Sequence, residues 1–328
     1  MFPPTKRKRM DDSVKNQMRS EGVKRSHSLW FEDGSVILEA QKTQFRVHRS
    51  ILCNYSKVFQ DMFTVPQPES SAMVDGVPLI HVIDDAVDWE NVLGIIYFGL
   101  KMHEDHSIGV LISMMRLGHK YQFDDIKTAA VQRLLKEFPT NFVEWTNDAA
   151  SDPHRTIMQN DAYFSRGHEI DLINIASEIQ FQQILPVLYY ILLRDRPLTE
   201  IFDGTMRKDR TVAMLAPETQ RILILGRDRI LRGTIAHTLA WFEGDITDDC
   251  ATCQGKRVGN ALNVAMGMLT YDVSVALQDT ASEIVAGLCN ECKEEAETEM
   301  ALGRQQLWAE LPSYFDLPSW DVLAKFNN

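Results

Sequence analysis

The chain of 328 residues carries 34 Lys and Arg against 46 Asp and Glu, which gives a formal net charge of −12. This acidic balance argues against general nucleic-acid binding and against binding to an anionic membrane surface, because both need clustered cations. A hydrophobic content of 45% is typical of a globular protein, and the length suggests about two domains. The longest apolar run, Ile184 to Leu193, is half the length of about 20 residues that a membrane-spanning helix needs.

Residues 1–28 are predicted to be a disordered basic tail, because they contain too few spaced apolar residues to offset the entropy lost on ordering. Four basic residues stand in a row near its start: Lys6, Arg7, Lys8 and Arg9. Nuclear import receptors bind such runs, and the alternative is a solvated basic arm without a receptor. No apolar leader follows this run, so we expect reduced cysteines and a nuclear or cytoplasmic location.

Residues 45–63, FRVHRSILCNYSKVFQDMF, are predicted to form a short strand followed by two tight helical pieces. Phe45 and Val47 alternate with polar residues, at the period of two that a half-buried strand shows. Ser56 is predicted to cap the second helical piece, because its hydroxyl can accept from a free amide there. That piece places four apolar side chains on one side: Val58, Phe59, Met62 and Phe63. The arrangement favours a scaffold that docks another chain over a catalytic site.

Similar patterns extend on both sides of this stretch. Further strands are predicted at Val36 to Ala40 and at Leu79 to Ile83. A one-faced helix is predicted after a capping Asp88, and it carries Tyr97 and ends at Gly99. Two more helices follow, and the second stops at Pro139. Short strands with paired helices predict an α+β domain over residues 29–139.

These segments together resemble the BTB/POZ fold from about Trp30 to Pro139. The resemblance is carried by WFEDGSVILEA, by the stretch with His48, Arg49 and Phe59, by VDGVPLIHVIDD, and by WENVLGIIYFG and MRLGHKYQFDDIKTAAVQRLLKEFP. In detail the chain looks most like the BTB proteins that fungi, especially mushroom-forming basidiomycetes, carry in many copies. The resemblance implies a non-enzymatic protein–protein interaction module that can self-associate, with a structural His48.

The resemblance also implies a docking surface, because in BTB domains the helix after Ser56 and its following loop help to bind cullin scaffolds. We therefore predict four protein-contacting residues: Phe59, Met62, Phe63 and Tyr97. Of the stripe, Phe59 is expected in the core and the Met62-Phe63 end near the docking surface. Cullin-binding relatives tend to carry a hydrophobic residue, any residue and an acid in that loop. Here Val65-Pro66-Gln67 has an amide in place of the acid. A substrate adaptor of a cullin-based ubiquitin ligase is therefore the alternative to a scaffold.

Residues 140–328 are predicted to be a mainly α-helical domain with an aromatic tail. Helical periodicity covers three stretches: 169–193, 217–242 and 260–288. The tail LPSYFDLPSW is interpreted as a clasp that folds back on this domain, or alternatively as a docking peptide.

Two CxxC pairs stand in the second domain: Cys250 with Cys253, and Cys289 with Cys292. Two such pairs can complete the tetrahedron of a structural Zn²⁺, and four cysteine ligands leave no open position for catalysis. Unliganded thiols and a disulfide or redox pair are the alternatives. A zinc-containing regulator associated with transcription is the weakest functional alternative. Since the sequence contains no phosphate loop, nucleophile elbow or HExxH motif, no enzyme is predicted.

Overall fold

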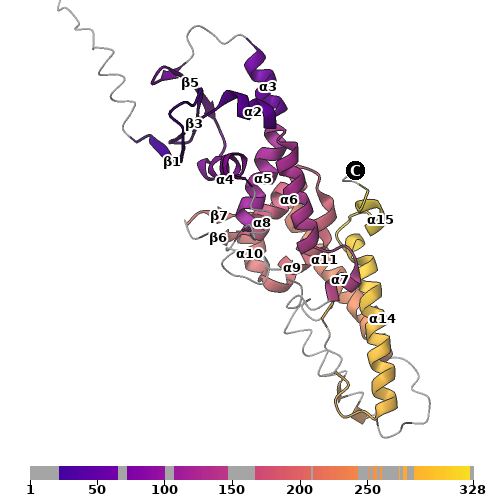
Figure 1. Ribbon diagram of the computed structural model, residues 1–328. Helices are drawn as coiled ribbons and strands as arrows, with labels where there is room; N and C mark the ends of the chain where they lie inside the picture. Colours follow the sequence, from indigo (N-terminus) through magenta and orange to yellow (C-terminus); the bar gives the residue numbers. More distant parts are fainter. Residues whose placement is uncertain are drawn as a thin grey trace, which may run out of the picture. The chain divides into compact units, whose positions relative to one another are not determined.

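The computed structural model describes residues 22–65, 72–99, 107–146, 167–207, 210–242 and 284–325, with a few further positions between 250 and 278 (Figure 1). The Lys6–Arg9 run, the Pro66–Gln67 dipeptide and most of the helical stretch predicted over 260–288 lie outside the described residues.

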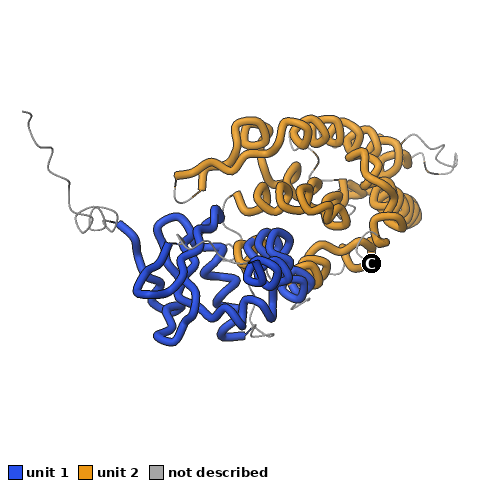
Figure 2. Tube along the Cα trace, turned by 90° about the horizontal axis from the view of Figure 1, so that it is seen from above, with its two compact units in different colours: residues 1–104, 113–129 blue, residues 105–112, 130–328 orange. Residues whose placement is uncertain are grey.

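The chain splits into two compact units, residues 1–104 with 113–129 and residues 105–112 with 130–328 (Figure 2). The division passes through helices α5 (Ile108–Tyr121) and α6 (Asp124–Glu137). The domain boundary predicted at residue 139 instead assigns both helices whole to the first domain.

Unit 1 contains a five-stranded mixed sheet, which confirms the predicted α+β class. Its strands lie in the order β1 (Lys24–Trp30), β3 (Thr43–Val47), β2 (Val36–Ala40), β5 (Val77–Val82) and β4 (Met73–Val74). The hairpin of β2 and β3 is antiparallel and places Leu38 opposite Phe45. Both of these side chains are fully buried, so the hairpin forms the centre of the sheet's core.

Strand β1 shows that the predicted disordered tail was wrong for residues 24–28. β1 runs parallel to β3, and the backbone amide of Lys24 donates to the carbonyl of Lys42 at 2.7 Å. Ser26 and Leu29 are buried, and the Leu29 amide donates to Ser26 Oγ at 3.2 Å. Residues 24–28 are all polar or charged, so their composition gives no indication of a strand. Pairing with a neighbour distant in sequence supplies the hydrogen bonds that order it.

Two short helices, α2 (Arg49–Tyr55) and α3 (Lys57–Thr64), follow β3 as predicted. Ser56 caps α3, since its Oγ accepts from the Phe59 amide at 3.1 Å, which confirms its predicted role. The same hydroxyl donates to the carbonyl of Tyr121 at 2.5 Å. One serine therefore starts α3 and also connects it to the end of α5.

Helix α4 (Ala86–Phe98) begins one turn earlier than predicted, with Asp85 at the cap position. Asp88 lies inside the helix and is buried, so the prediction that it caps the helix was wrong. Its carboxylate accepts from Ser113 Oγ and from the Arg116 guanidinium, each at 2.6 Å. Gly99 ends the helix with a φ of 82°, as predicted.

Unit 2 is mainly helical, as predicted. Its elements are α7 (Phe142–Thr146), α8 (His168–Glu178), η1 (Gln182–Ile184), α9 (Leu185–Asp195), α10 (Leu198–Asp203), the hairpin of β6 (Thr205–Met206) and β7 (Val212–Ala213), α11 (Pro217–Gly233), η2 (Thr234–Thr238), η3 (Ala240–Phe242), α14 (Asn290–Tyr314) and α15 (Trp320–Leu323). Every residue of α9 from Leu185 to Leu193 is buried, so α9 is the central helix of this unit. In the part of the chain that the structure describes, no helix has both the length and the apolar character needed to cross a membrane.

The aromatic tail folds back on unit 2, which confirms the clasp. The indole of Trp320 stacks on that of Trp308 with ring centroids 5.4 Å apart, and its Nε1 donates to the Trp308 carbonyl at 2.8 Å. Phe315 is buried and meets the ring of Tyr189 edge-on at 5.1 Å. These contacts hold the end of α14 against α9.

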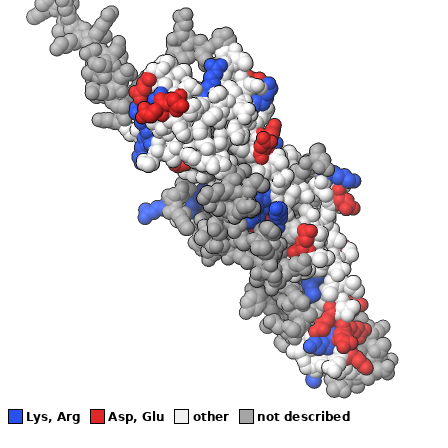
Figure 3. Space-filling view, viewed as in Figure 1, with Lys and Arg blue, Asp and Glu red and all other residues white. Residues whose placement is uncertain are grey.

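The start of α14 is strongly acidic. Figure 3 shows acidic side chains gathered where Figure 1 draws its first turns. The exposed ones are Glu291, Glu294, Glu295 and Glu299. Between residues 290 and 300, only Ala296 and Met300 are buried. Among the described residues, fewer side chains of α14 are buried at this end than around Trp308.

The middle of α14 contacts η2 backbone to backbone at Gly303. A Cβ at this position would lie 2.5 Å from the carbonyl oxygen of His237 and 2.6 Å from Cα of Thr238. Gly94 in α4 is the opposite case, since a Cβ there would meet nothing within 4 Å. Both glycines lie within helices, but only at Gly303 would an added Cβ collide with a neighbouring backbone.

We predict that Gly303→Ala lowers the free energy of unfolding by about 1–3 kcal/mol, because the added methyl group forces two backbones apart. Gly94→Ala should raise it by up to about 1 kcal/mol, because alanine favours the helix more than glycine does. Urea denaturation of both variants checks this pair. Equal effects of the two substitutions would contradict the close contact at Gly303.

Candidate functional site

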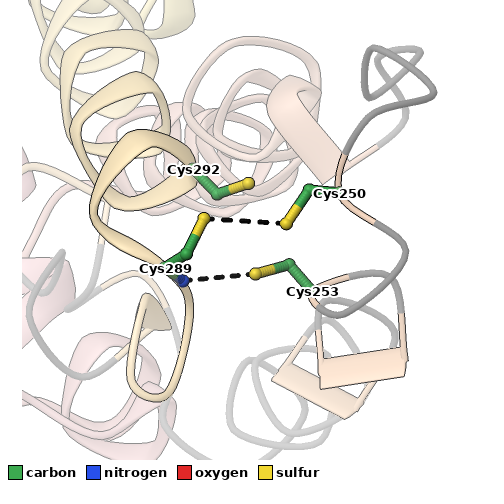
Figure 4. A group of neighbouring side chains, drawn as sticks. All are labelled: Cys250, Cys253, Cys289 and Cys292. Atoms are coloured by element: carbon green, nitrogen blue, oxygen red, sulfur yellow. Dashed lines mark hydrogen bonds between the residues drawn. The ribbon is translucent and has the colours of Figure 1, made fainter.

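Four cysteines converge in unit 2, as Figure 4 shows. They are Cys250, Cys253, Cys289 and Cys292, and their Sγ atoms all lie within 4.8 Å of one another. Thirty-five residues separate the two pairs in the sequence. The predicted ligand set is therefore brought together by the fold, and the fifth cysteine, Cys53, belongs to α2 in unit 1.

Each pair is shaped by its own local backbone. In the first pair, the Cys253 amide donates to the Cys250 carbonyl at 3.0 Å, which closes a tight turn. Before the second pair, Gly287 adopts a φ of 81°, a left-handed conformation that favours glycine. Cys289 then takes the N-cap position of α14, and Cys292 follows in its first turn. Each turn directs the two sulfurs of its own pair toward the common cluster.

The sulfur geometry is close to that of a tetrathiolate site. In a zinc tetrahedron with Zn–S bonds of about 2.3 Å, any two sulfurs lie about 3.8 Å apart. The Sγ atoms of Cys250 and Cys289 are 3.6 Å apart. The backbone amide of Cys289 also donates to Cys253 Sγ at 3.2 Å. An amide pointing at a sulfur stabilises the thiolate form, which is the form that binds metals.

Neighbouring groups shift the pKa values of three of these thiols: Cys250, Cys289 and Cys292. The backbone amide of Cys292 is the main cause that lowers the pKa of Cys289 to about 7, and the neighbouring thiols add to this. Hydrogen bonding with Cys289 raises the pKa of Cys292 to about 12, and hydrogen bonding with Cys253 raises that of Cys250. Cys289, at the N-cap of α14, therefore ionises before Cys250 and Cys292 do.

A small apolar cluster and two polar side chains support the second pair. Val285, Ala296 and Met300 are buried together, with three partly buried neighbours: Trp241, Ile284 and Leu288. The Lys256 ammonium donates to the Gly287 carbonyl at 2.7 Å, and the Asn260 amide donates to the Ile284 carbonyl at 2.7 Å. These two bonds tie the chain after the first pair to the turn before the second.

In unit 1, the predicted docking stripe is largely part of the core. Phe59 is 1% exposed and stacks on Tyr121 with centroids 5.3 Å apart. Phe63 is 9% exposed, and the Arg49 guanidinium lies 4.6 Å above its ring. Met62 is half-buried. Of the four apolar side chains on this face of α3, Phe59 and Phe63 are buried, and Val58 and Met62 are half-buried.

Tyr97 supports the junction between β3 and α2. Its hydroxyl accepts from the His48 amide at 2.7 Å and lies 3.1 Å from His48 Nδ1. Its ring stacks on Phe31 with centroids 4.5 Å apart, and burial raises the pKa of the Tyr97 hydroxyl. The other ring nitrogen of His48 lies 3.2 Å from a carboxylate oxygen of Asp33. The structure thus gives Tyr97 a packing role, and its role in binding a partner stays a prediction.

The comparison with protein families agrees with this architecture. Residues 31–137, about a third of the chain, match the family model of the BTB/POZ domain. This segment is a BTB/POZ domain. Such domains mediate protein–protein interactions and are not catalytic. A comparison with curated proteins gives no match. The family model does not single out fungal members, so the fungal resemblance stays a prediction.

The BTB/POZ domain exposes large apolar side chains that the sequence analysis did not single out. Ile83, directly after β5, is 91% exposed, Val87 in the first turn of α4 is 66% exposed, and Phe98 at its end is 61% exposed. A signal was present, since Val87 and Phe98 fall outside the periodic apolar face that contains Trp89 and Ile96. A large apolar residue on the wrong face of an amphipathic helix indicates a contact surface.

We predict that Tyr97→Phe lowers the free energy of unfolding by about 1–2 kcal/mol, because the partly buried His48 amide loses its acceptor. Tyr55→Phe is the matched control, since Tyr55 is 39% exposed, and should change stability by less than about 0.5 kcal/mol. Urea denaturation checks the pair. If Tyr97→Phe were as mild as the control, the hydroxyl would contribute little to this junction.

Proposed function

We propose that the protein is a non-enzymatic scaffold that binds another protein through its BTB/POZ domain. The observation that carries the proposal is the match of residues 31–137 to a family of interaction domains. The exposed apolar side chains of that domain support it. An isoleucine that is 91% exposed gains hydrophobic free energy when a partner removes it from water.

The first partner to test is a second copy of the chain. Ile83 and Val87 lie four residues apart, at the end of β5 and the start of α4, and both are largely exposed. A two-fold interface uses the same patch on both subunits, so one apolar patch that pairs with itself is sufficient for a dimer. Self-association would remove both side chains from water without a second kind of protein.

We predict a molar mass of twice 37.5 kDa for the purified protein by size-exclusion chromatography with light scattering. Ile83→Glu should return the mass to that of one chain, because two buried carboxylates would face each other across the two-fold axis. Ile235→Glu, at an exposed isoleucine of η2 in unit 2, should leave the mass doubled. A single-chain mass for the wild type at micromolar concentration would remove self-association and leave a different protein as the partner.

A cullin adaptor is the second candidate, and the end of α3 favours it. Met62 is half-buried there, and Val65, one residue after the helix, is 61% exposed. This apolar end coincides with the region that the BTB resemblance relates to cullin docking. Gln67 carries an amide where cullin-binding relatives tend to have an acid, and this difference favours the scaffold over the cullin adaptor.

We predict that a cullin, if it is the partner, is captured with the tagged wild type from cells and lost with Met62→Asp. Met73→Asp on β4 is the matched control, because Met73 is 56% exposed and should leave capture unchanged. Phe63 is unsuitable for this test, since an aspartate under Arg49 would disrupt the core. Quantitative mass spectrometry reads the result, and the absence of any cullin with the wild type would exclude the adaptor role.

A further inference from the structure

We propose that Cys250, Cys253, Cys289 and Cys292 bind one structural Zn²⁺ ion, which ties the chain at residues 250–253 to the N-terminus of α14. This inference concerns unit 2 and is independent of the BTB/POZ domain and its partners. It rests on the convergence of four sulfurs from two pairs that lie 35 residues apart.

The geometry favours a metal over a disulfide. All four Sγ atoms lie within 4.8 Å of one another, and the 3.6 Å contact joins Cys250 of one pair to Cys289 of the other. Disulfides join sulfurs in pairs at about 2.05 Å and give no reason for the two pairs to share one cluster. A zinc tetrahedron uses all four at the spacing of about 3.8 Å that Zn–S bonds impose.

The surroundings can stabilise the charge of such a centre. Four thiolates around Zn²⁺ carry a net charge of −2, and four thiol protons leave for solvent as the metal binds. The Cys289 amide already points at Cys253 Sγ, and the positive end of the α14 dipole lies at Cys289. The Lys256 ammonium is held beside the same turn by the Gly287 carbonyl. Oriented amides and a nearby cation are what a tetrathiolate needs.

The local packing explains what the metal would contribute. The first turns of α14 are acidic, and their apolar support is the small cluster of Val285, Ala296 and Met300. Among the residues that the structure describes, this cluster is the apolar contact of the helix start, so a metal would add a second anchor there. A metal that closes the 35-residue segment between Cys253 and Cys289 removes loop entropy from the unfolded chain and fixes the helix start.

The test begins with metal analysis of the full chain, purified with a tag that does not bind metals. Inductively coupled plasma mass spectrometry should find one zinc ion per chain. Cys253→Ser and Cys289→Ser should each lose most of it, while Cys53→Ser, at the cysteine of unit 1, should keep it. Circular dichroism of each variant shows whether the protein remains folded.

Two measurements on the wild type avoid the risk that a cysteine variant unfolds. Cobalt substituted for zinc should give the intense visible bands and sulfur-to-metal charge transfer of a tetrahedral thiolate site. Removal of zinc by a strong chelator should speed amide hydrogen exchange by about tenfold or more at Asn290–Met300, which the metal anchors, and leave Trp308–Tyr314 unchanged.

Three outcomes would overturn the proposal. The first is a chain without zinc and with five thiols that react with Ellman's reagent, which would mean unliganded cysteines. The second is a chain with fewer reactive thiols under denaturing conditions, which would mean a disulfide. The third is zinc that Cys53→Ser removes as readily as Cys289→Ser does, which would place the metal elsewhere.

Discussion

The burial of Phe59 under Tyr121 is the contact on which the first unit depends. The ring also meets Trp89 edge-on at 5.9 Å, so one side chain of α3 joins α4 and the end of α5. Ser56 strengthens the same junction, because its hydroxyl caps α3 and also donates to the Tyr121 carbonyl. A strand, a helical hairpin and two longer helices thereby become one packed domain, and the residues left outside this core are available for binding.

This division between core and surface shapes the proposed function. Phe59, Phe63 and Tyr97 are used by packing and hydrogen bonds, whereas Ile83 and Met62 offer apolar surface at different places. Two candidate partners can therefore be separated by substitutions that leave the core intact. Asp88 follows the same principle, because its buried carboxylate accepts hydrogen bonds from Ser113 and Arg116 within the domain.

The second unit is organised around α14, whose two halves are held by different means. The half near Trp308 is packed against η2 and α9, and Gly303 permits backbone contact there. The other half is acidic and starts at Cys289, beside the four cysteines and a small apolar cluster of described residues. The proposed zinc ion would anchor this helix start through four metal–sulfur bonds, in addition to the apolar cluster.

The sequence by itself determined the α+β class, the cap at Ser56, the end of α4 at Gly99 and the CxxC spacing. These features rest on local periodicity, on short-range hydrogen bonding and on residue types with special backbone freedom. Only the tertiary structure decided that Lys24–Trp30 is a strand, that Asp88 is buried, and that the two cysteine pairs meet. Each of these depends on a partner distant in the sequence. The CxxC spacing indicated that the cysteine pairs could meet, whereas no local pattern indicated the partners of Lys24–Trp30 and of Asp88.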